Sequence, residues 1–198
     1  VVVGSGIEVA SALKKMLGKK AHLSVFRNFG TAQVKYKDTE VEFVGARKES
    51  YNRDSRKPIV EDGTLEDDQN RRDFTINAMY YDPATEEVYD YHHGFEDIAK
   101  RRLRMIGEPA ERYREDPVRM LRAVRISAKL GFQIEPATER PISHMAKLLK
   151  NVPTARLVDE VLKLLTCGHA VECVKRLRED GLSAALLPVL DHLLSSPE

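Results

Sequence analysis

The stretch Glu115-Asp116-Pro117-Val118-Arg119-Met120-Leu121-Arg122-Ala123-Val124-Arg125 decides the architecture of the second half of this chain. Aspartate followed by proline is typical of a helix start, with Asp116 as the N-cap and Pro117 in the first helical position. Arginines recur every three residues, at 119, 122 and 125, so they share one face of the predicted helix. The other side carries residues that we expect to pack, namely Val118, Leu121, Val124 and Ala128.

Asp116 and Arg119 place a carboxylate and a guanidinium three residues apart on the arginine face. An acceptor and a forked donor at a fixed separation can hydrogen-bond the Watson–Crick edge of a nucleobase. Arg122 and Arg125, further along the helix, can hold phosphates bidentately. The alternative is a solvated face of i,i+3 salt bridges. The absence of acids between the three arginines favours ligand binding.

Helical patterns continue after this stretch, whereas the pattern before it is mixed. Apolar spacing predicts helices at 109–114, 117–130, 137–149, 154–166, 169–179 and 182–195, with glycine and proline at the breaks. Before residue 107 it predicts a helix at 7–17, strands at 21–26, 32–36 and 40–44, and a polar, mobile loop at 47–62. A helix at 64–78, a strand pair at 79–82 and 87–91, and a strand at 102–106 follow.

These elements predict an α+β fold, with a small mixed sheet in residues 1–107 and an all-helical part in residues 108–198. The composition, 42% hydrophobic and 32% charged, is that of a soluble globular protein, and no apolar run is long enough to cross a membrane. Cys167 and Cys173 do not form a disulfide framework, so we expect reduced thiols in a cytoplasmic protein without a membrane partner.

Positive charge is concentrated around the arginine helix. The net charge of the chain is only +1, which excludes a polycationic protein. Between residues 101 and 125, however, eight arginines stand against four acidic residues. This local excess can hold phosphate groups.

The stretch Arg71-Arg72-Asp73-Phe74-Thr75-Ile76-Asn77-Ala78 precedes two shorter patterns, Asp90-x-x-x-Gly94 and Asp97-x-x-x-Arg101. Alone, the twin arginines are more typical of a structural salt bridge. In this order and spacing, the motifs resemble those of bacterial poly(A) polymerases and class II CCA-adding tRNA nucleotidyltransferases. The resemblance runs from Val1 to at least Leu165. It implies a polymerase β-like nucleotidyltransferase head, a helical neck and the start of an RNA-binding body.

The resemblance also implies roles for individual residues. Asp116 and Arg119 match the pair that serves as a protein template for the incoming base, with Glu115 as a support in the same motif. Residues that match positions near the triphosphate and ribose are Arg72, Arg122 and Arg125. Further supporting positions are Arg71, Asp73 and Asn77.

Asp90 and Gly94 match a flexible motif that couples the head to the neck helices in this family. His93 stands where a second glycine is common, which argues against a freely moving hinge.

Family members bind two Mg²⁺ ions through an Asp-x-Asp on one strand and a third carboxylate on a neighbouring strand. Two metal ions can clamp the attacking 3′-oxygen and the leaving pyrophosphate. Glu42 matches the third carboxylate, and Glu40, on the same strand face, is its competitor. In relatives the Asp-x-Asp lies just before the strand end that Val1 to Val3 resemble. We therefore expect a fragment that is inactive alone.

The resemblance implies a template-independent enzyme that transfers AMP from ATP to an RNA 3′ end, in mRNA or tRNA. The stretch from Gly107 to Arg125 looks more like poly(A) polymerases, whereas residues 22–32 look more like CCA-adding enzymes, which use CTP and ATP. We favour the poly(A) type, because the base-recognition helix lies in the first of these stretches.

A catalytically inert RNA- or nucleotide-binding module is the other alternative for this chain. The arginine face and the basic loop at 47–57 would serve it. Four aromatic residues could stack on bases, but we expect core packing for them: Phe26, Phe29, Tyr80 and Tyr81.

Overall fold

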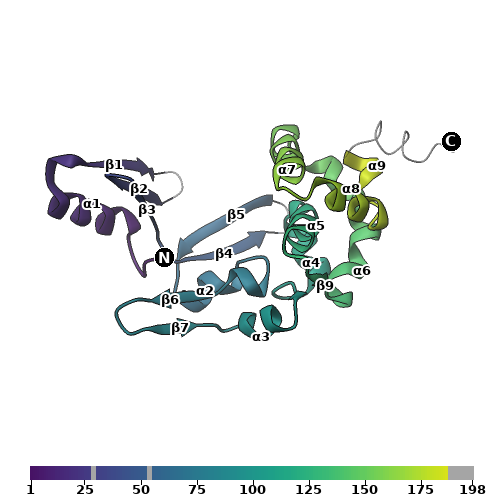
Figure 1. The fold of residues 1–198 in the computed structure, drawn as a ribbon, viewed down its shortest axis with the longest axis horizontal. Helices are drawn as coiled ribbons and strands as arrows, with labels where there is room; N and C mark the ends of the chain where they lie inside the picture. Colours follow the sequence, from purple (N-terminus) through teal and green to yellow (C-terminus); the bar gives the residue numbers. More distant parts are fainter. Residues whose placement is uncertain (28–29, 53–54, 187–198) are drawn as a thin grey trace. The chain divides into compact units, whose positions relative to one another are not determined.

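The computed structural model describes residues 1–27, 30–52 and 55–186 (Figure 1). The chain divides into two compact units. Unit 1 comprises residues 1–71 and 80–87, and unit 2 comprises residues 72–79 and 88–198. The units do not test the predicted domain boundary at residue 107, which stays a prediction. No helix in the described ranges is both long and apolar enough to span a bilayer.

Unit 1 begins with a helix packed on a three-stranded sheet. The helix α1 (Gly6–Leu17) is capped by Ser5, whose side chain accepts a hydrogen bond from the Glu8 amide, and it leads through η1 (Gly18–Lys20) into the sheet. The antiparallel strands are β1 (Ala21–Phe26), β2 (Thr31–Tyr36) and β3 (Thr39–Val44), in that order. Ala10 of α1 is buried against Ala32 and Val34, so α1 covers one face of the sheet. These elements agree with the predicted helix and strands.

The predicted mobile loop at 47–62 is wrong. This segment forms an antiparallel hairpin of β4 (Arg47–Asn52) and β5 (Ser55–Asp62), in which Arg47 pairs with Asp62 and Lys48 with Glu61. Opposite charges directly across the ladder stabilise a pair of polar strands. The sequence pattern missed the hairpin because it relied on apolar residues, which polar two-stranded ribbons do not need.

The predicted helix at 64–78 is also too long. A capping box at Thr64 and Asp67 starts α2 as predicted, but α2 spans only Leu65–Asn70, and a short 3-10 turn, η3 (Thr75–Asn77), follows later. Between them, Phe74 has an extended backbone and pairs with Met105. Because the Asp73 carboxylate accepts hydrogen bonds from the Phe74 amide and Asn77 Nδ2, the local backbone has partners other than those of a continued helix.

The hairpin β6 (Tyr80–Asp82) and β7 (Glu87–Tyr89) confirms the predicted strand pair, within two residues at its ends. In unit 2, α3 (Gly94–Ala99) precedes β8 (Arg102–Leu103), which pairs in parallel with β9 (Gln133–Ile134). The predicted strand at 102–106 is therefore shorter than expected. The strand β9 was not predicted, because two residues carry no measurable alternation.

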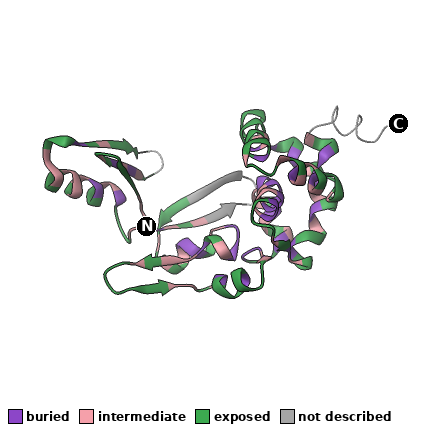
Figure 2. Ribbon diagram, viewed as in Figure 1, coloured by how far each residue is buried: buried purple, intermediate pink, exposed green. Residues whose placement is uncertain are grey.

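Helices make up most of the rest of unit 2: α4 (Pro109–Glu115), α5 (Val118–Leu130), α6 (Pro136–Met145), α7 (Thr154–Thr166), α8 (Ala170–Glu179) and α9 (Ser183–Leu186). The 3-10 turn η4 (Ala146–Asn151) replaces the end of the predicted helix at 137–149. The end of the helix expected at 182–195 lies outside the described residues. The core is formed around α5, where Leu121, Val124 and Ala128 are buried as predicted (Figure 2).

Candidate nucleotide-binding site

Asp116 lies at the corner between α4 and α5 in unit 2. Its backbone is extended and ends α4, and the helix α5 begins two residues later. The predicted N-cap is displaced by one residue, because Pro117 occupies that position. Asp116 Oδ1 nevertheless accepts a 3.2 Å hydrogen bond from the Val118 amide, and Oδ2 accepts one of 2.7 Å from Arg156 Nη2 in α7. Both carboxylate oxygens are thus held in place.

Arg119 lies one turn further on and is almost fully buried, with 6% of its surface exposed. Its Nη1 donates to Oε2 of Glu115 at 3.0 Å and to the carbonyl of Arg112 at 2.9 Å. Arg112 Nη1 donates to the same Glu115 oxygen at 2.8 Å. Glu115 therefore fixes Arg119 through a shared carboxylate. The Arg119 amide donates a 3.1 Å hydrogen bond to the Asp116 carbonyl, but within the described residues the two side chains form no ion pair with each other, so the alternative of an i,i+3 salt bridge fails for this pair.

Arg122 connects α5 to the motif that starts at Arg71. Its Nε donates a 2.6 Å hydrogen bond to Oδ2 of Asp73, whose other oxygen holds the Phe74 amide and Asn77. The carbonyl of Arg72 accepts a 2.6 Å bond from Arg112 Nη2. The segment that carries Arg72, Asp73 and Asn77 is thereby fixed against α4 and α5. One third of the Arg122 side chain is exposed and can reach a ligand.

Arg71 belongs to the other unit. Its guanidinium contacts Asp68 at 2.7 Å and Glu49 at 3.4 Å, and so connects α2 to β4. Tyr80 donates a hydrogen bond to the same buried Asp68. The supporting role predicted for Arg71 has a structural counterpart in these contacts within unit 1.

Arg125 lies on the inner part of the arginine face. Its Nη2 is 3.7 Å from Oε2 of Glu160 in α7, and both side chains are largely buried. Arg125 Nε and Glu160 Oε2 are buried without a hydrogen-bond partner among the described residues. This ion pair is therefore loose. Lys163 supplies a second cation for Glu160, at 3.2 Å. The three arginines of α5 thus face three different carboxylates, those of Glu115, Asp73 and Glu160.

The Asp90–Gly94 motif forms a capped helix start. Asp90 Oδ1 and Oδ2 accept hydrogen bonds from the amides of Gly94 and Phe95, at 2.8 and 3.0 Å. A side chain at Gly94 would place its Cβ only 2.5 Å from the Thr75 carbonyl, so glycine allows α3 to approach η3. His93 adopts φ 60° and ψ 39°, a left-handed conformation that glycine adopts more readily.

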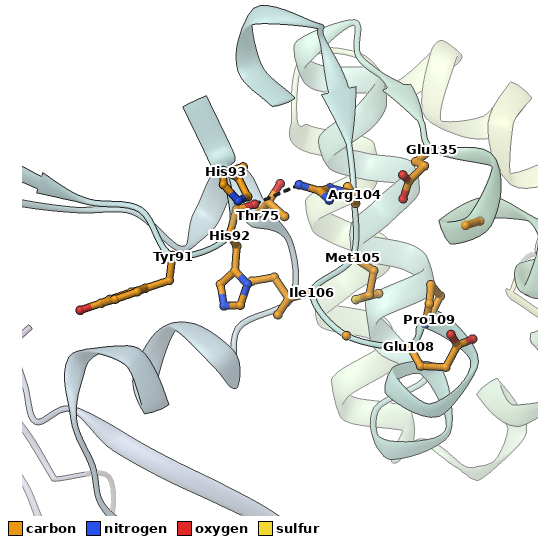
Figure 3. A pocket seen from close by; sticks show the side chains of 12 residues that line it. Thr75, Tyr91, His92, His93, Arg104, Met105, Ile106, Glu108, Pro109 and Glu135 are labelled. Carbon is orange, nitrogen blue, oxygen red and sulfur yellow. Dashed lines mark hydrogen bonds between the residues drawn. The ribbon is translucent and has the colours of Figure 1, made fainter. Parts of the chain in front are cut away.

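Beside this motif, a pocket of about 410 Å³ lies between residues 91–93 and the segment from Arg104 to Pro109 (Figure 3). Arg104 Nη2 donates to the His92 carbonyl at 3.0 Å across it. Neither Asp116 nor any arginine of α5 lines this pocket. It is therefore distinct from the predicted base-recognition site.

The wall that carries Arg104 is anchored by Asp97, which is fully buried. Burial raises the pKa of Asp97, but hydrogen bonds from Thr75, Arg102 and Arg104 outweigh burial and hold the pKa below its usual value. The third motif, Asp97-x-x-x-Arg101, thus contributes a buried carboxylate that orders its surroundings.

Glu42, the predicted metal ligand, lies on β3 in unit 1 and is exposed. Its neighbour across the ladder is Gln33, whose amide donates to the competing carboxylate, Glu40. Across the described ranges, no three His, Cys, Asp or Glu side chains form a cluster that could hold a metal ion. Glu42 therefore fits a metal ion as one ligand, and the described residues do not form a complete metal site.

Sequence reasoning missed Arg112, Arg156 and Glu160 as parts of this site. Arg112 was counted in the arginine excess, but nothing in its spacing shows that it braces Glu115 and Arg72. Arg156 lies 40 residues from its partner Asp116, and Glu160 lies 35 residues from its partner Arg125. Pairs this distant in sequence have no periodic signal.

Comparison with known sequences agrees with this geometry. The family described as "Poly A polymerase head domain" matches residues 1–104, and the family described as "Probable RNA and SrmB-binding site of polymerase A" matches residues 131–194. Poly(A) polymerase I of Haemophilus influenzae is 48% identical over 136 residues, 69% of this chain and 30% of the relative. The A-adding tRNA nucleotidyltransferase of Aquifex aeolicus is 36% identical over 184 residues, 90% of this chain and 22% of the relative.

Solved structures show the same fold. A CCA-adding enzyme in its apo form has a TM-score of 0.84 at 28% identity, over 94% of this chain and 44% of that one. A tRNA nucleotidyltransferase complexed with a primer tRNA and an ATP analogue has a TM-score of 0.79 at 30% identity, over 93% of this chain and 52% of that one.

The chain therefore spans about 30% of the length of the poly(A) polymerase I that it matches. The head-domain match alone covers more than half of the 198 residues, and it confirms the resemblance drawn from the motifs. This chain belongs to the poly(A) polymerase head-domain family, a family of nucleotidyltransferases that includes relatives of the CCA-adding type.

Proposed function

We propose that this chain selects the incoming nucleotide for a template-independent RNA 3′-end nucleotidyltransferase that transfers AMP from ATP to RNA. The observation that carries the proposal is the corner of α4 and α5, where Asp116 and Arg119 are fixed by separate partners in a chain of this family. A carboxylate and a guanidinium that do not neutralise each other remain able to bind a ligand.

The chemistry of the pair favours adenine and cytosine over guanine and uracil. Both adenine and cytosine present an amino group on the Watson–Crick edge, beside a ring nitrogen that accepts. The Asp116 carboxylate can accept from the amino group, and Arg119 can donate to the ring nitrogen. Guanine and uracil present a carbonyl beside an N–H, which reverses both roles. Arg119 uses only Nη1 toward described residues, so its remaining N–H groups have no protein acceptor there.

The phosphates would lie near two half-buried arginines of this unit, Arg72 and Arg122. Asp73 holds the Arg122 side chain, which can therefore donate without a large loss of side-chain entropy, and Arg112 holds the backbone carbonyl of Arg72. The proposal includes Mg²⁺ with Glu42 as one ligand. When bound, Mg²⁺ would offset the negative charge of the triphosphate. The proposal also includes an RNA 3′ end as the acceptor. It further includes a cytoplasmic location.

Higher sequence identity to poly(A) polymerases favours transfer of AMP over CCA addition. The poly(A) polymerases I of Haemophilus influenzae and Escherichia coli are 48% and 51% identical over their matched regions, whereas the CCA-adding enzyme of Bacillus velezensis is 36% identical. The second candidate is CCA addition. It is favoured by the solved structures, because a tRNA-processing enzyme with CTP matches 92% of this chain at a TM-score of 0.80.

Equilibrium titration of the chain with each of the four nucleoside triphosphates tests the proposal. We expect ATP to bind and GTP and UTP to bind at least about fivefold more weakly, because reversed donors and acceptors cost about 1–3 kcal/mol. Asp116→Asn, which keeps the shape and removes the charge, should reduce the preference for ATP over GTP. Arg114→Ala, at an exposed arginine of α4, serves as the control.

Each alternative has its own result. Equal binding of ATP and CTP would favour the CCA type over the poly(A) type. Binding of RNA with no binding of any nucleotide would show a plain RNA-binding module and overturn the proposal.

A further inference from the structure

The two cysteines of this chain meet at the corner between α7 and α8 in unit 2 (Figure 1). The helix α7 ends at Thr166, and Cys167 is its C-cap. Gly168 follows with φ 84°, a left-handed conformation that glycine adopts without steric cost, so the chain turns and α8 begins at Ala170. One turn into α8, Cys173 lies beside Cys167 again.

The sulfur atoms of the two cysteines are in direct contact. Cys167 Sγ lies 3.6 Å from Cys173 Sγ, and it also donates to the Leu164 carbonyl at 3.3 Å. A thiol carries a single hydrogen, so the Cys173 thiol is the donor between the two sulfurs. An S–S bond is about 2.05 Å long, so the sulfurs are roughly 1.5 Å from bonding distance. Small rotations of the two side chains cover this distance.

The two thiols differ in their access to solvent. Cys167 is half-buried, whereas Cys173 is fully buried in the core around α5. Burial, followed by the hydrogen bond with Cys167, raises the pKa of Cys173 to about 12, although the charges of Arg125 and Arg176 act in the opposite direction. Since the thiolate is the form of cysteine that reacts with oxidants, a dissolved oxidant meets Cys167 first, and Cys173 is placed to react second.

Two other uses of a thiol pair fit these contacts less well. Buried cysteines can serve as small apolar side chains that fill a core, but such packing requires neither the contact between the sulfurs nor the solvent access of Cys167. A metal site needs further ligands, and among the residues that the structure describes no third His, Cys, Asp or Glu completes such a group. The chemistry that the pair itself offers is oxidation to a disulfide.

We propose that Cys167 and Cys173 form a reversible disulfide when the protein meets a peroxide, and that this bond fastens the end of α7 to α8. The inference is independent of the proposed function, because it rests on the two thiols alone. Disulfides in a reducing compartment are typically transient and respond to oxidants, which agrees with the reduced thiols expected from the sequence.

The reaction takes place in two steps. The Cys167 thiolate attacks one oxygen of hydrogen peroxide, the O–O bond breaks, and the other oxygen leaves as hydroxide, which gives a sulfenic acid at Cys167. The Cys173 sulfur then attacks the Cys167 sulfur, the S–O bond breaks, and the departing hydroxide takes the Cys173 proton. Two thiols and one peroxide thus give one disulfide and two water molecules, and the two electrons lost by the sulfurs reduce the peroxide.

The corner that this bond would fasten supports α5. The helix α7 carries Glu160, which lies 3.7 Å from Arg125 of α5. The helix α8 carries Arg176, which donates to the Phe132 carbonyl at 3.1 Å and to the Ser127 hydroxyl, at the end of α5. A disulfide between residues 167 and 173 closes a ring that restricts the unfolded chain, so we expect oxidation to stabilise the packing of both helices on α5.

Mass spectrometry of the full chain, treated with a small excess of hydrogen peroxide at neutral pH and then digested with trypsin, tests the inference. The tryptic peptide 164–175 contains both cysteines and no methionine, so other oxidation does not change its mass. We expect this peptide to lose two hydrogen atoms, while the chain remains a monomer in non-reducing electrophoresis. Dithiothreitol should restore both thiols. The midpoint of urea denaturation should be higher for the oxidised chain than for the reduced chain.

Single substitutions separate the roles of the two thiols. Cys173→Ala keeps the accessible thiol and removes its partner, so Cys167 should stop at a sulfenic acid, which dimedone traps, and peroxide should not raise the urea midpoint. Cys167→Ser leaves Cys173 alone in the core, where it should stay reduced under conditions that convert the parent chain completely. The parent measurement needs no substitution, so it decides the inference even where a variant folds poorly.

Three results would overturn the inference. The first is a peptide that gains oxygen at a cysteine without losing hydrogen, which would show that the sulfurs do not reach each other. The second is a disulfide-linked dimer as the main product, which would show that Cys167 reacts between chains. The third is an oxidised chain whose urea midpoint is unchanged or lower, which would show that the bond does not fasten α7 to α8.

Discussion

Arg156, in α7, donates a 2.7 Å hydrogen bond to Oδ2 of Asp116, forty positions earlier in the chain. The same carboxylate accepts from the Val118 amide through Oδ1. One arginine thus ties the helical part of unit 2 to the residue proposed to contact the base. Since each carboxylate oxygen has two lone pairs, Asp116 keeps acceptor capacity for a ligand while its position is set by two protein donors.

We predict that Arg156→Ala weakens ATP binding up to about fivefold and leaves binding of inorganic triphosphate unchanged. Half of the Arg156 side chain is exposed, so the ion pair contributes at most about 1 kcal/mol. The effect should fall on base recognition, because Asp116 becomes less restrained. Titration of both ligands checks this, and Arg156→Lys should restore part of the ATP affinity. Equal weakening for both ligands would contradict a role at the base.

At the Asp90–Gly94 motif, we predict opposite outcomes for two adjacent substitutions. Gly94→Ala should lower the free energy of unfolding by about 1–3 kcal/mol, because the new Cβ would lie 2.5 Å from the Thr75 carbonyl. His93→Gly should be neutral or stabilising by up to about 1 kcal/mol, since it relieves a left-handed backbone at φ 60°. Urea denaturation measures both. A decrease in stability from His93→Gly as large as that from Gly94→Ala would refute the distinction.

We predict that the ionised Asp97 carboxylate stabilises the folded chain and that this stabilisation is lost at low pH. Its folded pKa is held below the usual value, so its contribution is fully present above a pH of about 4 and disappears as the pH falls through the folded pKa. Asp97→Asn should lower the free energy of unfolding at neutral pH by about 3 kcal/mol, because Arg102 and Arg104 would be left without a buried carboxylate.

Denaturation curves at several pH values check this prediction. The stability of the parent chain should fall more steeply below pH 4 than that of the Asp97→Asn variant. Asp38→Asn, at an exposed turn residue, should behave like the parent. Parallel pH profiles for the parent and Asp97→Asn would show that Asp97 does not titrate as its contacts imply.

The carboxyl group of Asp180 should destabilise the fold at neutral and higher pH, in contrast to that of Asp97, which stabilises it there. Burial, followed by the charges of Glu139 and Glu179, raises the pKa of Asp180 to about 6. A carboxyl group with a raised folded pKa destabilises the fold increasingly as the pH rises from about 4 through about 6. We predict that Asp180→Asn stabilises the chain at pH 8 by on the order of 1–2 kcal/mol, reduced for partial exposure to solvent, and has little effect at pH 4. Thermal unfolding at both pH values measures the difference, and an equal effect at both would exclude titration of Asp180 as its source.

Local patterns predicted the elements whose partners are close in sequence. The spacing of apolar residues in α1 and α5 placed these helices within a residue or two of their observed bounds, since an amphipathic helix repeats its own signal. The same reasoning failed for 47–62 and for 64–78. In those segments the structure depends on pairing across β4 and β5 and on the bridge between Phe74 and Met105.

The sequence by itself predicted the candidate residues for base recognition and determined the helix that carries the three arginines, because an Asp-Pro helix start and a three-residue arginine spacing are local properties of the chain. Tertiary structure decided how those residues are held. Asp116, Arg122 and Arg125 meet Arg156, Asp73 and Glu160 across α5. Such contacts arise only when segments at least 35 residues apart pack on one core, and no pattern within a single segment encodes them.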